Sequence, residues 1–155
     1  MEYSYKFRIY PSKTQVQQIQ RTFGCCRFVW NYYLAMRKDI YEQDGKTMNY
    51  YACCKDMTQL KKTLLWLKEA DATALQSSLQ NLDAAYQNFF RRVKQGQKPG
   101  YPKFKSKRNR RQSYKSKSVK IFCCPVLYRY TNRIVAIYRG DGRYRHGAES
   151  TCNHL

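Results

Sequence analysis

The first residues of the chain alternate between apolar and polar side chains. The apolar positions are Tyr3, Tyr5, Phe7 and Ile9. A period of two predicts a half-buried β-strand. Pro11 ends the run, because proline cannot donate to a strand ladder. We therefore expect a strand over residues 3–10, with a helix soon after it.

After Pro11 the apolar residues recur with a period near 3.6, which is typical of an α-helix. Ser12 and Gln15 have capping-box spacing, which predicts a helix start, and Gly24 is expected to end this helix or turn it sharply. A second amphipathic stripe over residues 29–40 predicts a second helix, which Asp44 and Gly45 stop.

Two further helices are predicted. The third begins near Asn49, and a packed corner anchored by Trp66 follows it. The fourth begins at Asp71 or Thr73 and ends at Gly96. The expected core comprises Phe23, Phe28, Trp30, Leu34 and the apolar stripe from Leu75 to Phe90. Four such helices can form a small bundle.

The charge is concentrated in one stretch. The chain has 155 residues and a formal net charge of +20, and residues 91–120 hold 13 basic side chains and no acidic one. Such a stretch favours a polyanionic partner, with nucleic acid first. No apolar run is long enough for a membrane span, and the N-terminus lacks a signal-peptide core. We expect no membrane partner and a cytoplasmic, nucleoid-associated protein.

Residues 96–118 have no helical period, and their aromatic side chains alternate with cations. Cations bind phosphates and aromatic faces stack on bases, so this segment predicts nucleic-acid contact, with a solvated linker as the alternative. Engaging about six cations gives an expected log–log salt slope near −5. The predicted phosphate-binding residues are Arg91, Arg92, Lys94, Lys103, Lys105, Lys107, Arg108, Arg110, Arg111 and Lys115.

The seven cysteines do not have zinc-site spacing. Six form adjacent pairs, no CxxC occurs, and both histidines lie near the C-terminus. We expect reduced, buried thiols, no metal site and no cofactor. No Ser-His-Asp or Cys-His set is within reach.

Four motifs occur in order: KFRIYPSKTQ, TFGCCRFVWNYYL, ALQSSLQNLDAAYQNFFRRVKQG and KPGYPKFKSKRNRRQSY. Together they resemble the N-terminal part of the TnpB/OrfB family of transposon-associated, RNA-guided nucleases, often called transposases. The resemblance covers roughly residues 1–118. It implies an α+β fold, in which a helical recognition lobe, or helix-turn-helix domain, joins an incomplete β-barrel formed by the N-terminal strand and the segment after the last helix.

The resemblance also implies partners and two further site residues. Family members bind a guide-type RNA and recognise a DNA motif beside the target. Tyr50 and Gln76 fall at positions that face this DNA in relatives, although Ala72 stands where relatives often have lysine. Glutamine can read a base edge, and an exposed structural role for Gln76 is the alternative.

The family's nuclease needs several carboxylates to hold two metal ions. Only Asp141 and Glu149 follow Asp83 in this sequence, so we expect no catalytic residue and no enzyme activity. Residues 121–155 contain no lysine and do not match the family's continuation, which suggests a truncated copy with a frameshifted tail; a genuine tail rich in Arg and Tyr is the alternative.

The expected organisation has four parts: a first barrel strand (1–11), a helical domain (12–95), a basic nucleic-acid-binding segment (96–120) and the atypical tail (121–155). A helix-turn-helix regulator, an active nuclease completed by another chain, and a non-functional transposon remnant are the alternative interpretations.

Overall fold

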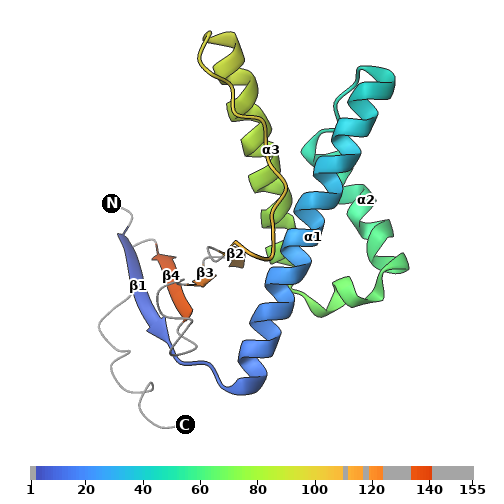
Figure 1. Ribbon diagram of the computed structural model, residues 1–155. Coiled ribbons are helices and arrows are strands. Elements are labelled where there is room, and N and C mark those ends of the chain that lie inside the picture. The colour runs from blue at the N-terminus through green and yellow to red at the C-terminus, as the bar shows by residue number, and fades with distance from the viewer. Residues whose placement is uncertain (1–2, 110–111, 117–118, 124–133, 141–155) are drawn as a thin grey trace.

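We describe the protein from a computed structural model. It describes residues 3–109, 112–116, 119–123 and 134–140. The order of elements is β1 (Tyr3–Ile9), α1 (Lys13–Asp44), α2 (Tyr50–Thr63), the 3₁₀ helix η1 (Leu65–Glu69), α3 (Ala72–Lys94), β2 (Ser113–Ser116), β3 (Val119–Cys123) and β4 (Ile134–Gly140). The strands β1 and β4 lie on one side of the long helix α1, and α2 lies on its other side (Figure 1).

Helix α1 begins as predicted. The Ser12 hydroxyl accepts from the Gln15 backbone N–H at 3.4 Å, and the Gln15 side chain accepts from the Ser12 N–H at 2.9 Å. Together they satisfy two otherwise unpaired donors of the first turn. At the other end, Gly45 takes the left-handed conformation, with φ of 66°, and closes the helix.

The predicted break at Gly24 is wrong, because α1 continues through it as one helix of 32 residues. Gly24 does not have the positive φ of a helix-ending glycine. An interior glycine costs a helix only about 1 kcal/mol, and the buried side chains of Phe23, Cys25 and Cys26 around it hold the helix against the core. Burial therefore overrides the local signal.

The other helix starts agree with the sequence. Asn49 caps α2 by accepting from the Ala52 N–H at 2.8 Å, and Asp71 caps α3 by accepting from the Thr73 N–H at 3.1 Å. The corner between them is η1, but its anchor is Leu67, which is fully buried. Trp66 is 41% exposed and packs edge-on against Phe28, so its predicted role as the anchor is wrong.

The core lies between α1, α2, η1 and α3. Its largest fully buried side chains include Tyr33, Leu34, Leu67, Leu75 and Leu82. The predicted stripe on α3 is buried from Leu75 to Tyr86, but Phe90 is 45% exposed, so the stripe leaves the core one turn early. The bundle core is otherwise as the periodicity predicts.

The described strands form an antiparallel sheet in the order β1-β4-β3-β2. β1 and β2 are its two edges and do not pair with each other, so the described strands make an open sheet and the predicted barrel is not formed by them. β1 pairs with β4, from Tyr3 opposite Gly140 to Ile9 opposite Ile134. β2 and β3 belong to the same sheet but do not pair directly with β1.

The sheet is attached to the bundle through β2. The Tyr114 ring packs edge-on against Phe23 with centroids 5.2 Å apart. Ser116 hydrogen-bonds both Asp71 and Thr73 at the start of α3. These contacts fix where the basic segment ends.

Candidate nucleic-acid interface

The chain reverses direction at the end of α3. Gly96 has a φ of 65°, a left-handed conformation that favours glycine. The Gly96 N–H donates to the Val93 carbonyl at 3.1 Å, and the Gln97 N–H donates to the Arg92 carbonyl at 3.0 Å. The following segment then runs back beside α3 toward β2 (Figure 1).

This returning segment is held to α1 by polar contacts with its backbone. Trp30 Nε1 donates to the Lys103 carbonyl at 3.0 Å. The Asn31 amide donates to the Lys105 carbonyl at 2.9 Å and accepts from the Lys105 N–H at 2.8 Å. Pro102 is buried. Residues 101–105, which we call the docked segment, are thus fixed to the bundle at their backbone. Nucleic-acid contact by this segment stays a prediction.

Tyr101 fixes the start of the docked segment. Its hydroxyl lies 3.0 Å from the Tyr86 hydroxyl, and its ring packs edge-on against Tyr86 and Phe89. Burial, together with the hydrogen bond to Tyr101, raises the pKa of Tyr86. The Tyr86 phenol is therefore neutral at physiological pH, as its hydrogen bond to Tyr101 requires.

The predicted cations lie along this path. Arg91, Arg92 and Lys94 are exposed in the last turn of α3, where a cation suits the negative end of the helix dipole. The exposed cations farther along are Lys103, Lys105, Lys107, Arg108 and Lys115. We call these eight residues the cationic strip. Arg110 and Arg111, also predicted, lie outside the described residues.

The cationic strip begins at one end of α3 and finishes beside the other. A helix of 23 residues is about 34 Å long. Phosphates of one DNA strand are spaced about 3.4 Å apart along the axis. The strip therefore has the length needed to contact several successive phosphates.

Lys105 differs from the other cations of the strip. Its ammonium lies 3.9 Å from the centroid of the Trp30 ring. Burial lowers the pKa of Lys105, and a cation over an aromatic face gains electrostatic stabilisation. The sequence did not distinguish Lys105 from its neighbours, because the contact joins residues far apart in the chain.

Two aromatic residues predicted to meet bases have different environments. Phe104 is 62% exposed and stands between two cations of the strip. Tyr114 is half-buried against the core, and burial raises its pKa. Phe104 therefore has a face open for base stacking, whereas Tyr114 is structural.

The two residues taken from the family resemblance lie apart from the docked segment. Gln76 is exposed on α3. The Tyr50 hydroxyl accepts from the Gln80 amide at 3.4 Å, and Tyr51 packs edge-on beside it with 79% of its surface exposed. Gln80 is thus a polar neighbour of Tyr50 that the sequence did not reveal, one helical turn from Gln76. Base reading by Tyr50 and Gln76 stays a prediction.

The cysteines with described side chains are free thiols. Cys25, Cys26 and Cys53 are buried, and Cys54 is half-buried. Burial, with a smaller effect of the Cys25 thiol, raises the pKa of Cys26 to about 12. A protonated thiol is a poor nucleophile and metal ligand. Within the described part of the chain, no group of three metal-ligand side chains gathers. Asp141, Glu149 and both histidines lie outside it.

A comparison with family models points to a class of protein. A model of the helix-turn-helix domain of the OrfB/IS605 type matches residues 1–46, which comprise β1 and α1. No helix in the described residues is long and apolar enough to cross a membrane.

Three curated relatives identify the family. A Streptomyces pristinaespiralis protein named as an RNA-guided DNA endonuclease is 33% identical over 71% of this chain, and InsQ of Escherichia coli K12, named in the same way, is 32% identical over 67%. The virulence protein VsdF of Salmonella dublin is 32% identical over 55% of this chain and 79% of its own length. The chain belongs to the TnpB/OrfB family.

The chain spans about a quarter of the length of the first two relatives, with 27% and 25% of them covered. The matches agree with the predicted family. The hypothesis of a frameshifted tail stays a prediction. β4 lies in that tail, however, and it pairs with β1 at seven positions.

Proposed function

We propose that this chain is a nucleic-acid-binding module of a transposon-associated protein, and that it binds through the cationic strip. The observation that carries the proposal is the docking of residues 101–105 by Trp30 and Asn31. Because the backbone is fixed, the cations of the strip start from defined positions. Less conformational entropy is then lost on binding than with a free basic tail.

Phosphates are the proposed ligands of the strip. Between Asp83 and Asp141 the sequence contains no acidic residue, so the cations of the strip follow one another along the chain with no carboxylate between them. Arg91, Arg92 and Arg108 can hold phosphate oxygens in a bidentate way, whereas the lysines act as point charges. The exposed Phe104 adds a surface for an unpaired base.

We propose DNA and a guide-type RNA as the two partners. The relatives' names mention an RNA guide and a DNA target. Tyr50 and Gln76 supply the proposed contact with DNA bases, since both are placed on helices beside each other. The cationic strip supplies contacts to the backbone of either nucleic acid.

The proposed role is binding without cleavage. Two-metal hydrolysis needs several carboxylates close together, and only Asp141 and Glu149 follow Asp83. Purified protein with magnesium is therefore expected to leave duplex DNA and RNA intact, as judged by denaturing gels. Metal-dependent cleavage by the pure chain would contradict this part of the proposal.

The proposal is tested by purifying the protein, sequencing any nucleic acid that comes with it, and measuring binding at low ionic strength. A variant with Lys103, Lys107 and Arg108 changed to Gln is expected to bind at least about tenfold more weakly. The matched control changes Lys55, Lys62 and Lys68 to Gln, exposed residues outside the strip. Equal losses in both variants, or no binding by the wild type, would contradict the proposal.

A further inference from the structure

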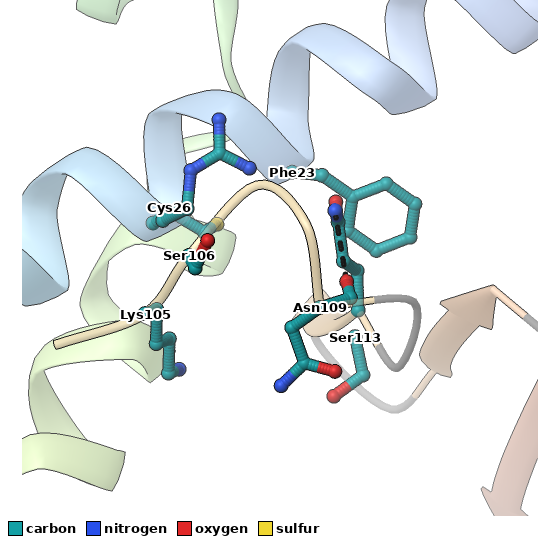
Figure 2. Close-up of a pocket in the computed structure, with 8 residues that line it drawn as sticks. Phe23, Cys26, Lys105, Ser106, Asn109 and Ser113 are labelled. Carbon is teal, nitrogen blue, oxygen red and sulfur yellow. Dashed lines mark hydrogen bonds between the residues drawn. The ribbon is translucent and has the colours of Figure 1, made fainter. Parts of the chain in front are cut away.

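A pocket of about 180 Å³ lies where the chain passes from the docked segment to β2. Its polar walls come from Arg27 on α1 and from Lys105, Ser106, Asn109, Gln112 and Ser113. In Figure 2 the side-chain ends of Lys105, Asn109 and Ser113 point to the same side of the loop. Residues far apart in the sequence therefore present polar groups to one space.

The chemistry of these walls suits an anion. Two of the lining residues are cations, four are neutral hydroxyl or amide residues, and none is acidic. Several donors around a single space match a group with several acceptor oxygens. A carboxylate, which a metal or ammonium ligand would need, is not among the lining residues.

Hydrogen bonds among the described loop residues hold one wall of the pocket. The Gln112 amide donates to the Lys107 and Asn109 carbonyls, each at 3.3 Å. The Arg108 N–H donates to the Ser106 hydroxyl at 3.1 Å, and the Asn109 N–H donates to the Ser106 carbonyl at 3.2 Å. These bonds close the loop on itself, so binding requires little rearrangement.

Lys105 is the most constrained cation of the site. Asn31 holds both of its backbone groups, and its ammonium lies 3.9 Å from the Trp30 ring centroid. Lys103 provides a natural comparison, because its carbonyl is also held, by Trp30, while it is absent from the pocket lining. The backbone of both lysines is thus held to α1, but only Lys105 has its ammonium beside the Trp30 ring and lines the pocket.

We propose that this pocket is a subsite for one phosphodiester group of a bound nucleic-acid strand, with Lys105 as its phosphate-binding cation. This inference rests on the proposed function. A volume of about 180 Å³ equals roughly six waters at about 30 Å³ each, which leaves room for a phosphate and part of its sugar. The other strip cations then contact neighbouring phosphates from the surface.

The experiment uses the full chain with Trp66→Phe, so that Trp30 is the single tryptophan. In this background, Lys105→Met is compared with Lys103→Met, and binding of labelled oligothymidylate is measured by fluorescence anisotropy. Lys105→Met keeps the apolar stem over Trp30 and removes the charge. We expect it to weaken binding about tenfold or more, and Lys103→Met about threefold or less.

Trp30 emission, followed during titration with oligothymidylate and separately with inorganic phosphate, identifies the source of the anion. A change with both probes supports a site that also takes free phosphate, and a change with oligothymidylate alone supports one that needs a strand. No change with either overturns the subsite.

Equal losses for Lys105→Met and Lys103→Met, with the wild type binding well, would also overturn the subsite while leaving the proposed function intact. If the wild type fails to bind oligothymidylate at low salt, both the proposed function and the subsite fail. Thermal melting of Lys105→Met checks that the variant is folded.

Discussion

The helical bundle and the docked segment are held together by different forces. Leu67, Leu75 and Leu82 are almost completely buried, and the bundle forms around them by apolar packing. The docked segment instead depends on hydrogen bonds from Trp30 and Asn31 to its backbone. Apolar packing is nondirectional and proportional to area, whereas hydrogen bonds fix particular atoms.

This difference separates stability from binding. The buried apolar side chains of the core stabilise the bundle and present no charged group to a ligand. The docked segment buries Pro102 and leaves Lys103 exposed, and Lys107 and Arg108 just after the segment are exposed as well. Substitutions in the bundle should therefore change the free energy of unfolding, and substitutions in the segment should change nucleic-acid affinity.

The largest expected effect is in the core. Leu75 is fully buried, so Leu75→Ala should lower the free energy of unfolding by about 2–5 kcal/mol through lost burial and a cavity. Urea denaturation measures it. Leu65, 64% exposed, provides the control, and Leu65→Ala should change stability by less than about 0.5 kcal/mol. Similar effects for both would mean that the bundle core is not where we place it.

A second effect separates a buried ion pair that joins α1 to α3 from an exposed ion pair within α1. Arg37 lies 2.8 Å from Asp83 and its side chain is 4% exposed. Asp83→Ala leaves this guanidinium buried without its carboxylate, and we expect a loss of about 2–3 kcal/mol, reduced because Asp83 is partly exposed. Glu42→Ala removes the exposed Lys38–Glu42 pair and should cost less than about 0.5 kcal/mol.

The buried thiol beside the docked segment predicts a pH dependence. The pKa of Cys26 is raised by burial to about 12 in the folded protein, against about 8.5 in an unfolded chain. Above about pH 8.5 the unfolded state loses this proton first, so the stabilisation present at lower pH is lost as pH rises toward 12, by up to about 1.4 kcal/mol per pH unit. Cys26→Ala should unfold with a shallower alkaline slope, and an unchanged slope would contradict the buried position of the thiol.

The smallest change in stability should accompany a clear change in binding. Asn31→Ala removes both hydrogen bonds to Lys105, and we expect a stability loss of about 1–2 kcal/mol. Hydrogen exchange at the Lys105 amide should become faster, and nucleic-acid affinity should fall several-fold. Asn88→Ala, on the exposed side of α3, is the control. Unchanged exchange in Asn31→Ala would show that the segment is not docked through Asn31.

The caps and stripes of the helices could be predicted because their signals are local. Ser12 and Gln15 are three residues apart, and the Asn49 and Asp71 caps bond residues two or three positions away. The predicted break at Gly24 is wrong because a glycine inside a helix is a weak signal when the residues beside it are buried against the core.

The docked segment could not be predicted because its contacts span the chain. Trp30 and Lys103 are 73 residues apart, and Asn31 and Lys105 are 74 apart. The composition of the segment identified its cations, but it could not show that the backbone at Lys103 and Lys105 is held to α1. In the same way, the pairing of β1 with β4 joins the two ends of the described chain, and alternation alone cannot name a strand's partner.

The central claim is that the cationic strip binds the phosphates of nucleic acid, and the dependence of affinity on salt tests it most directly. The binding constant for duplex DNA is measured over a range of salt concentrations for the wild type and for the variant with Lys103, Lys107 and Arg108 changed to Gln. Contacts to about six phosphates predict a log–log slope near −5 for the wild type, made shallower by about 2–3 in the variant. A wild-type slope near zero, or the same slope in both proteins, would contradict the account.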